Sequence, residues 1–254
     1  MNLKNYISDT AVMSGRVLKR TLRSVDTIIT VVAMPVMIML ASVYIYGGAM
    51  NLGAVSYVDY IVPGIILFCI GSGVAYAAVR LNDDVTKGIF ERFHSMPIAK
   101  SSILGGHVLV SVAFNAVSCL AVLIVAFIMG FRPHADIACW LAAAAILVIF
   151  TVSMTWIAVA SGLLAGSMET SGVFSYILLA LIFTSSGFAP TDTMPAGLRA
   201  FAERQPMTSV IDSVRSLLVD GRFTGSIWAA LAWCAVIWAV FQIIALRAYK
   251  GRMK

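Results

Sequence analysis

The amino-acid sequence predicts an all-α membrane protein with six transmembrane helices. Of its 254 residues, 60% are hydrophobic and only 12% are charged, fractions well outside the range of soluble domains. The apolar residues are gathered into runs of about 20 residues or more, which is the length that a helix needs to cross about 30 Å of hydrocarbon. The runs are apolar on every side, whereas the strands of a membrane β-barrel alternate in polarity, so a helical bundle is predicted.

Six runs are long enough to be spans. They are Thr27–Tyr46, Val58–Val79, Ile103–Gly130, Ala138–Ala165, Ser171–Phe188 and Ile227–Leu246. The first run is a full span, without the short apolar stretch and small-residue cleavage site of a signal peptide, so we expect it to remain in the mature protein. The four cysteines lie singly, which predicts packing residues rather than a disulfide framework or a metal cluster. They are Cys69, Cys119, Cys139 and Cys234.

Residues 1–26 predict an amphipathic helix ahead of the first span. Basic residues recur at i, i+3, i+4 and i+7 and therefore share one helical face, opposite an apolar one. The basic residues are Arg16, Lys19, Arg20 and Arg23, and the apolar ones are Ile7, Ala11, Leu18, Leu22 and Val25. We expect this helix to lie flat in the cytoplasmic interface, with its basic side toward lipid phosphates or a protein partner. An anchor to lipid alone is the simpler alternative.

The positions of lysine and arginine predict that both termini are cytoplasmic. In that orientation 13 of the 18 basic residues lie in cytoplasmic segments, so the inner face carries a charge near +7 and the outer face a charge near −1. Basic loops close to spans are retained on the cytoplasmic side. The isoelectric point of about 9.3 then reflects topology and anionic lipid headgroups, and we expect no nucleic-acid partner.

The predicted spans contain no Asp, Glu, Lys or Arg near their centres. Such groups mark proton relays and ion-coupled carriers. Their absence makes a gradient-driven carrier or channel the less favoured function, and we keep it as the alternative. The sequence also contains no HExxH metal helix and no complete nucleophile turn, so we assign no catalytic and no metal-binding residue. Because the GxxxxGK[ST] phosphate loop is absent too, energy from ATP would have to enter through a partner.

Gly162 and Gly166, in GLLAG, form a small-xxx-small pair within the fourth predicted span. Such a pair lets two helices approach closely. Two interpretations stay open, a seam between two subunits and packing within one subunit.

Residues 80–101, RLNDDVTKGIFERFHSMPIAKS, are the longest predicted cytoplasmic segment between spans. Asp83 and Asp84 can cap a short helix there. Met96-Pro97 would end that helix, because proline disfavours the α conformation at the residue before it. We expect a short helix across the cytoplasmic mouth, and a plain solvated loop is the alternative.

Residues 190–225 are too polar and too interrupted to span, and they predict an outer hairpin of two short helices that dips back into the membrane. Pro195 and Pro206 mark the helix starts. The second helix has an apolar face formed by Val210, Ile211, Val214, Leu217 and Leu218. Asp212 and Arg215, three residues apart, are expected to pair on its polar side.

These features resemble the membrane subunits of ABC-2 type exporters, particularly the daunorubicin-resistance-like permeases. Two motifs carry the resemblance, which covers essentially the whole chain. The first runs from Lys87-Gly88 through Arg92 to Met96-Pro97. The second lies in the tract from Leu178 to Arg215 and comprises Leu181, Ser185, Gly187, Met194-Pro195, Pro206-Met207, Ser209 and Arg215. Thr184 departs from the family pattern, where an apolar or small residue is usual.

The resemblance implies a non-catalytic membrane subunit of an ATP-driven exporter in the bacterial cell membrane. The substrate would be lipophilic or amphiphilic, such as a drug, an antibiotic or a lipid-like compound. Two permease copies would assemble, most simply as a homodimer, with two cytoplasmic ABC ATPase subunits. ATP and Mg²⁺ would bind those partners, and we expect no cofactor on this chain.

The resemblance also implies roles for particular segments. Residues 27–254 would form the transmembrane domain, with a coupling helix in residues 80–101 that contacts the ATPase and a gate in residues 190–225. The implied coupling residues are Asp84, Lys87, Gly88, Glu91, Arg92, Met96 and Pro97. The implied gate residues are Phe188, Pro190, Met194, Pro195, Pro206, Asp212 and Arg215.

Overall fold

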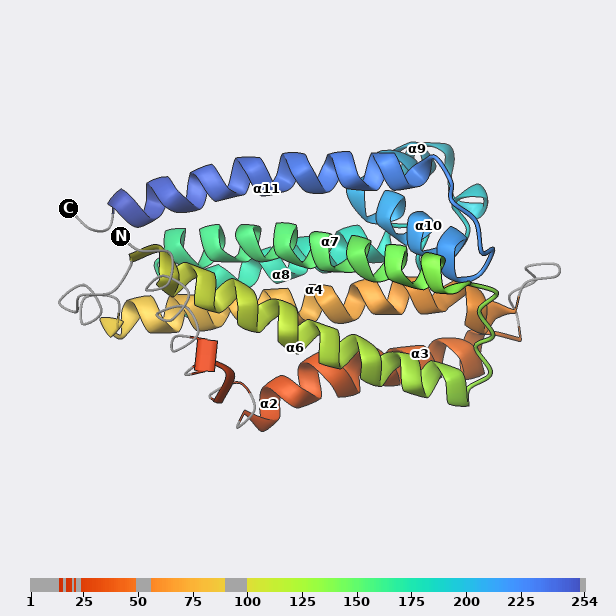
Figure 1. Ribbon diagram of the computed structural model, residues 1–254, viewed down its shortest axis with the longest axis horizontal. Coiled ribbons are helices and arrows are strands. Elements are labelled where there is room, and N and C mark those ends of the chain that lie inside the picture. Colours follow the sequence, from red (N-terminus) through yellow and green to blue (C-terminus); the bar gives the residue numbers. More distant parts are fainter. Residues whose placement is uncertain are drawn as a thin grey trace.

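A computed structural model describes residues 14–15, 17–19, 21, 24–48, 56–89 and 100–251, and this part of the chain is helical without a strand (Figure 1). The first helix is continuous and comprises α2 (Val25–Ile28), η1 (Ile29–Ala33), α3 (Met34–Ala41) and η2 (Ser42–Tyr46). It is followed by α4 (Tyr57–Thr86), α6 (Lys100–Ile128), α7 (Ile137–Leu164), α8 (Met168–Phe183), η3 (Thr191–Thr193), α9 (Ala196–Arg204), α10 (Pro206–Leu218) and α11 (Ser226–Gly251).

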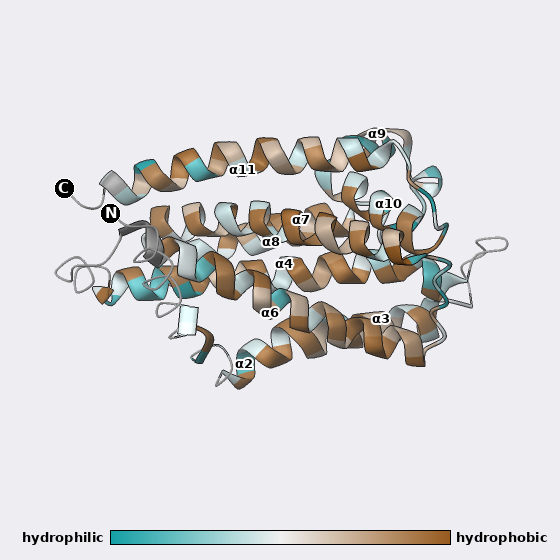
Figure 2. Cartoon of the chain, viewed as in Figure 1, coloured by the Kyte–Doolittle hydropathy of each residue, from teal (hydrophilic) through white to brown (hydrophobic). Residues whose placement is uncertain are grey.

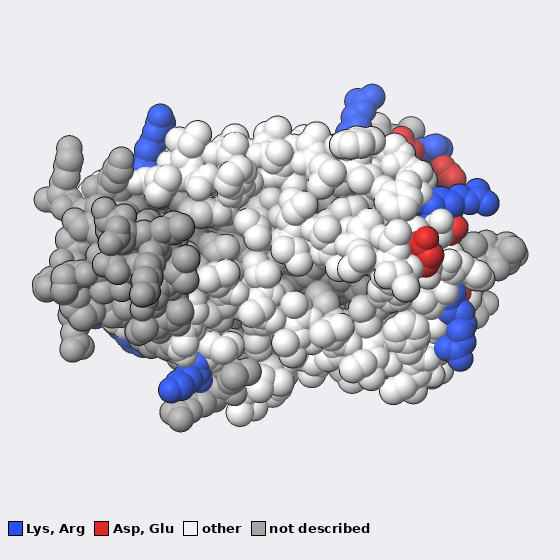
Figure 3. All heavy atoms as spheres, in the orientation of Figure 1, with Lys and Arg blue, Asp and Glu red and all other residues white. Residues whose placement is uncertain are grey.

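Five of the helices are long and apolar enough to cross a membrane. They cover Val25–Tyr46, Tyr57–Thr86, Leu104–Ile128, Ile137–Leu164 and Ser226–Tyr249, and they match the first four predicted spans and the last one. The long helices run side by side along one axis (Figure 1). Their middle parts are hydrophobic, and hydrophilic residues gather at the two ends of that axis (Figure 2). On the face in Figure 3, the charged side chains lie toward the two ends as well, which suits a bundle that spans a bilayer along its length.

The predicted fifth span differs from the helix that occupies it. The prediction was Ser171–Phe188, whereas α8 covers Met168–Phe183 and has only 16 residues, about 24 Å at 1.5 Å per residue. Thr184 ends the helix, and its hydroxyl donates to the Ala180 carbonyl at 2.7 Å. The count of six spans therefore stays a prediction.

Helix α4 is the centre of the bundle and packs against α6, α7, α8 and α10. Its 30 residues correspond to a length of about 45 Å. The prediction that this helix ends at Val79 and that Asp83 and Asp84 cap a new one is wrong. Both acids are buried in the last two turns of α4, and the helix ends only at Lys87 and Gly88. Gly88 adopts the left-handed conformation (φ +67°) that commonly follows a helix C-terminus.

The small-residue pair of α7 packs within the subunit at one of its two positions. A Cβ atom on Gly162 would lie 2.7 Å from the Ala78 carbonyl oxygen of α4, whereas a Cβ atom on Gly166 would meet nothing within 4 Å. Close approach of α4 and α7 therefore explains Gly162. The four cysteines are buried and not joined in disulfides, as predicted for packing residues.

Asn82 fastens the end of α4 to the end of α7. Its side-chain amide is fully buried and donates to the carbonyls of Gly162 (3.0 Å) and Ala165 (2.9 Å). We expect Asn82→Leu to lower the free energy of unfolding by about 1–3 kcal/mol, because both carbonyls lose a donor in a buried place. Thermal unfolding in detergent measures the loss. Ser72→Ala is the control, since among the described residues the Ser72 hydroxyl bonds only within its own helix, to the Phe68 carbonyl. An unchanged unfolding temperature for Asn82→Leu would show that these hydrogen bonds between α4 and α7 do not stabilise the fold.

Candidate functional site

The turn that follows α8, residues 184–189, is the place where the predicted hairpin meets the bundle. Its backbone is folded back on itself, because the Ser185 hydroxyl donates to the Ile182 carbonyl (2.5 Å) and accepts from the Gly187 N–H (3.1 Å). Ser185 and Ser186 are both buried although they are polar. Buried polar groups need hydrogen-bond partners, so the neighbours of this turn are informative.

Two glycines bring this turn against α4. A Cβ atom on Gly64 would lie 2.4 Å from the Gly187 carbonyl oxygen and 2.7 Å from its Cα atom. A Cβ atom on Gly187 would lie 3.1 Å from the Gly64 Cα atom. The two backbones are therefore in direct contact, and the preceding residue, Pro63, cannot donate a helical hydrogen bond in this part of α4.

Arg215, on α10, connects three separate parts of the fold at this point. Its guanidinium donates to the Ser186 carbonyl (2.7 Å), to the Tyr60 carbonyl (3.2 and 3.3 Å) and to the Asp212 carboxylate (2.8 Å). The guanidinium carbon also lies 4.0 Å from the centre of the Tyr60 ring. We call Tyr60, Ser186, Asp212 and Arg215 the hairpin junction. The planar fork of arginine suits such simultaneous contacts.

Further hydrogen bonds close the hairpin junction. The Ser186 hydroxyl donates to Asp212 at 2.6 Å, and the Tyr60 hydroxyl donates to the Ser186 carbonyl at 2.8 Å. The Arg215 side chain is 15% exposed and that of Asp212 is 42% exposed. The charge pair is thus largely shielded on its cationic side and open to solvent on its acidic side. Such a junction can hold α10 against α4 and the turn.

The apolar side of α10 anchors the hairpin as the sequence predicts. Val210, Ile211, Val214, Leu217 and Leu218 are all at most 1% exposed. Helix α10 packs against α11, α7 and α4, and Figure 1 shows it at one end of the bundle, among these helices. Close packing of these side chains against the three helices fixes α10 in place.

The remaining predicted gate residues surround the junction without joining it. The Phe188 ring stacks on that of Phe183 (4.8 Å between centroids), and the Phe188 carbonyl accepts from the Tyr57 hydroxyl at 3.2 Å. The other residues lie at helix boundaries. Pro190 precedes η3, Met194 follows it, Pro195 precedes α9 and Pro206 begins α10.

Helix α9 carries its own exposed ion pairs. Arg199 contacts Glu203 at 2.7 Å and Asp192 at 3.0 Å. The hydrogen bond to Glu203, followed by the charges of both acids, raises the pKa of the Arg199 guanidinium above its ordinary value. Exposed ion pairs of this kind contribute little to the free energy of unfolding. They orient the side chains of α9 and η3 relative to each other.

Sequence reasoning predicted the Asp212–Arg215 pair but missed Tyr60, Gly64 and Ser186. Tyr60 and Ser186 are 126 residues apart in the chain, and no periodic pattern connects them. The only available signal was Pro63-Gly64 inside an apolar run, since such residues in a helix interior often mark a close contact.

At the opposite end of α4, the predicted coupling residues are only partly described. Lys87 pairs with Asp83 (2.8 Å), and the buried Asp84 carboxylate lies 3.5 Å from the equally buried His107 imidazole of α6. Gly88 ends α4. The others, Glu91, Arg92, Met96 and Pro97, lie outside the described residues, as does the helix predicted for them.

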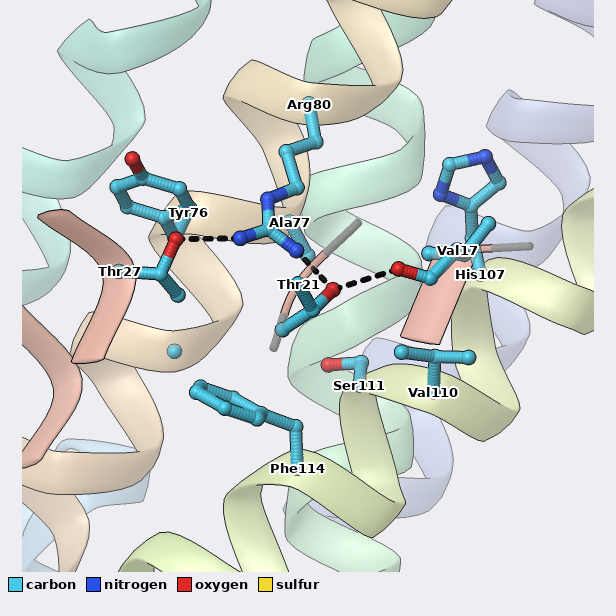
Figure 4. A pocket seen from close by; sticks show the side chains of 11 residues that line it. Val17, Thr21, Thr27, Tyr76, Ala77, Arg80, His107, Val110, Ser111 and Phe114 are labelled. Atoms are coloured by element: carbon cyan, nitrogen blue, oxygen red, sulfur yellow. Dashed lines mark hydrogen bonds between the residues drawn. The ribbon is translucent and has the colours of Figure 1, made fainter. Parts of the chain in front are cut away.

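A small cavity of about 30 Å³ lies near this end, between α4, α6 and the N-terminal segment (Figure 4). In Figure 4 the Arg80 guanidinium points from α4 to the hydroxyls of Thr21 and Thr27, and it donates a hydrogen bond to each. The cavity is large enough for a water molecule but not for a drug-sized ligand. These contacts attach the N-terminal segment to α4.

The amphipathic helix predicted for residues 1–26 is described only in part. Lys19, one of its four basic residues, is exposed, as predicted for the basic face. The other three, Arg16, Arg20 and Arg23, lie outside the described residues. Placement of this helix in the membrane interface stays a prediction.

Comparison with known proteins adds independent information. The family model of the ABC-2 type transporter matches residues 9–219. The daunorubicin resistance ABC transporter permease protein DrrB1 of Streptomyces coeruleorubidus is 27% identical over 226 residues, 89% of this chain and 80% of the relative. The probable doxorubicin resistance permease DrrC of Mycobacterium tuberculosis is 25% identical over 246 residues, 94% of this chain and 87% of the relative. The putative transport permease ycf38 of Porphyra purpurea is 26% identical over 195 residues, 75% of this chain and 66% of the relative.

Proposed function

Because the chain belongs to the ABC-2 type transporter family, we propose that it is the permease of an ATP-driven exporter of lipophilic or amphiphilic compounds. It is a multi-pass membrane protein and an ABC transporter membrane subunit, a kind of subunit that is generally non-catalytic. The proposal adds the energy source, the class of substrate and the direction. ATP and Mg²⁺ bind two separate cytoplasmic ATPase subunits, and two copies of this chain form the passage.

The observation that carries the proposal is the continuity of α4. Its first turn lies at the hairpin junction through Tyr60, and its last turn ends at Lys87 and Gly88, where the segment predicted to contact the ATPase begins. We infer that this helix of about 45 Å moves as one body across Pro63, its one interior proline. A push at the Gly88 end therefore displaces the Arg215 contacts at the other end. We infer that α4 transmits ATP-driven motion to the hairpin of α9 and α10, which gates the exit.

A groove beside α4 supports the class of substrate. It has a volume of about 150 Å³ and lies between η1, α4 and α8. Hydroxyls of Thr30, Ser72, Tyr76 and Ser175 line it among small and apolar residues, and no charged residue lines it. Weakly polar walls of this kind suit an amphiphile better than an ion, for which ionisable groups are usual.

The proposed location is the inner membrane of a bacterium, with both termini in the cytoplasm. The excess of basic residues on the side of the termini supports this orientation. The hairpin then faces outward and is re-entrant into the outer leaflet. Cysteine accessibility tests it, since a thiol placed at Asp192 should react with an impermeant reagent from outside, and one at Lys87 should not.

The coupling role predicts the effect of one charge reversal. We expect Arg92→Glu to leave membrane insertion intact but to reduce co-purification of the ATPase subunit by roughly tenfold, because loss of a charge-assisted contact costs about 1.5–3 kcal/mol. Affinity capture of the tagged permease with its ATPase measures the effect. Arg247→Glu, an exposed residue near the end of α11, is the control. Equal capture by the Arg92→Glu and natural chains would remove Arg92 from the contact.

Reconstitution tests the function as a whole. The chain in liposomes, with an ATPase from a neighbouring coding sequence, should stimulate ATP hydrolysis and accumulate an amphiphilic dye against its gradient. The chain without the ATPase should not do so. Uphill transport by the chain alone, driven by an ion gradient, would instead support the carrier alternative.

A further inference from the structure

A second hollow lies apart from the hairpin junction, where α8, α9, α10 and α11 meet. Its volume is about 460 Å³, within the range of about 300–1,000 Å³ that ligand pockets occupy. Leu181 of α8, Phe201 of α9 and Trp233 of α11 supply apolar walls. Figure 1 shows α9 beside the start of α11, so the hollow is at the hairpin end of the bundle. Phe201 and Trp233 are 50% and 40% exposed, and this side is therefore open to the surroundings of the helices.

Gln205 lines the hollow and has unmet hydrogen-bonding capacity. It joins α9 to α10 in extended conformation (φ −78°, ψ 153°), and the residue is only 4% exposed. The nitrogen and the oxygen of its side-chain amide are both buried, and neither has a hydrogen-bond partner in the described part of the chain. A buried amide without partners is unfavourable, and in native proteins it often indicates a ligand or water molecule. Rotation of this side chain toward the hollow would offer a ligand one donor and one acceptor group.

Arg204 adds a positive charge to the same hollow. It is exposed, lines the hollow, and forms no ion pair with any acid among the described residues. Arg199, five residues earlier on α9, is in contrast already paired with Asp192 and Glu203. A guanidinium without a carboxylate partner is suited to bind phosphate in bidentate fashion.

We propose that this hollow binds one phosphate-bearing lipid of the surrounding leaflet. The phosphate contacts Arg204, an ester or headgroup oxygen contacts the Gln205 amide, and an acyl chain lies along Leu181, Phe201 and Trp233. Tryptophan is common at the membrane interface, and Trp233 marks the place where the acyl chain of the lipid enters the hollow. The bound lipid fills the space between α9 and the ends of α8 and α11. The lipid site requires only that the protein spans a bilayer. Its test is therefore independent of the proposed export function.

Quenching of Trp233 fluorescence tests the site. A variant that retains only Trp233, with Trp140, Trp156, Trp228 and Trp238 replaced by Phe, is placed in nanodiscs that contain acyl-brominated phosphatidylglycerol or phosphatidylcholine. We expect phosphatidylglycerol to quench at a mole fraction roughly tenfold lower, because it adds an anionic headgroup to a charge-assisted contact. Arg204→Gln should abolish the preference, whereas Arg199→Gln, the matched control on the same helix, should keep it. Ala200→Phe, which fills the hollow, should reduce quenching by both lipids.

Several results would overturn the site. Equal quenching by the two lipids would show that Arg204 does not select an anionic headgroup. A preference that survives Arg204→Gln, or an equal loss in Arg199→Gln, would leave only a general effect of surface charge. Unchanged quenching in Ala200→Phe would mean that Trp233 senses bulk lipid alone. Displacement of the lipid by soluble glycerol phosphate would show a site for free phosphate.

A second measurement guards against misfolded variants. Native mass spectrometry of the natural chain should show a retained phosphatidylglycerol that the Arg204→Gln chain loses and the Arg199→Gln chain keeps. Retention of the lipid by Arg204→Gln chains that elute as a single species would contradict the proposal without any tryptophan replacement.

Discussion

Replacement of Arg215 by leucine is expected to destabilise the protein by about 2–4 kcal/mol. The substitution removes all four guanidinium hydrogen bonds of the hairpin junction and leaves the Ser186 and Tyr60 carbonyls with fewer donors. Removal of one partner from a buried charge pair costs about 3–5 kcal/mol, and we lower this range because Asp212 is 42% exposed. Thermal unfolding in detergent should shift downward by about 5–15 °C.

The same substitution should reduce export. If about 1.4 kcal/mol of the loss falls on only one of two gate conformations, their population ratio changes roughly tenfold. ATP-dependent dye accumulation in liposomes measures this change. Arg215→Lys should be intermediate, because an ammonium can still pair with Asp212 but lacks the planar fork that reaches two further carbonyls.

Arg222→Gln is the matched control for Arg215. Arg222 is exposed, and its side chain makes no hydrogen bond or ion pair with the described residues. Its unfolding temperature and transport rate should match those of the natural chain. Equal behaviour of Arg215→Leu and Arg222→Gln would show that the hairpin junction holds nothing together.

Gly64→Ala is expected to have an effect of similar size, about 3 kcal/mol or more. The added Cβ atom would lie 2.4 Å from the Gly187 carbonyl oxygen, and both contacting groups belong to backbones that cannot rotate away. Overpacking in a core usually costs about 1–3 kcal/mol, with larger losses where no side chain can move. We expect α4 and the 184–189 turn to separate, which would lower the unfolding temperature and weaken the Arg215 contacts.

A series of glycine substitutions distinguishes this contact from a general effect of alanine. Gly187→Ala should cost about 1 kcal/mol, because its Cβ atom would lie 3.1 Å from the Gly64 Cα atom and a small shift relieves the crowding. Gly197→Ala, in α9 with nothing within 4 Å, should be neutral or stabilise by up to about 1 kcal/mol. If the three variants unfold at the same temperature, the close approach of the two backbones has no energetic role.

Local patterns were sufficient to predict most of the fold. Long apolar runs predicted the first four spans and the last one. A spanning helix needs about 20 consecutive apolar residues, and such a run can be recognised in the sequence directly. The apolar spacing of residues 206–218 likewise predicted the buried face of α10, and a three-residue separation predicted the Asp212–Arg215 pair.

The end of α4 shows where local reasoning failed. The apolar run that predicts the second span ends at Val79, and Asp83 and Asp84 resemble capping residues that begin a new helix. Both side chains are instead buried in α4, where Lys87 contacts Asp83 and His107 lies near Asp84. A carboxylate can stay inside a bundle when neighbours compensate its burial, and His107 of α6, the neighbour of Asp84, does not lie in the local pattern.

The sequence by itself therefore determined the class of protein, the positions of five of the six predicted spans and the family resemblance, because hydropathy and motif spacing are properties of neighbouring residues. Only the tertiary structure decided how long α4 is, that Tyr60 and Ser186 share Arg215, and that Gly64 touches Gly187. The contacts of Tyr60 with Arg215 and of Gly64 with Gly187 join residues more than a hundred positions apart, and a single close approach leaves no repeat in the sequence from which it could be predicted.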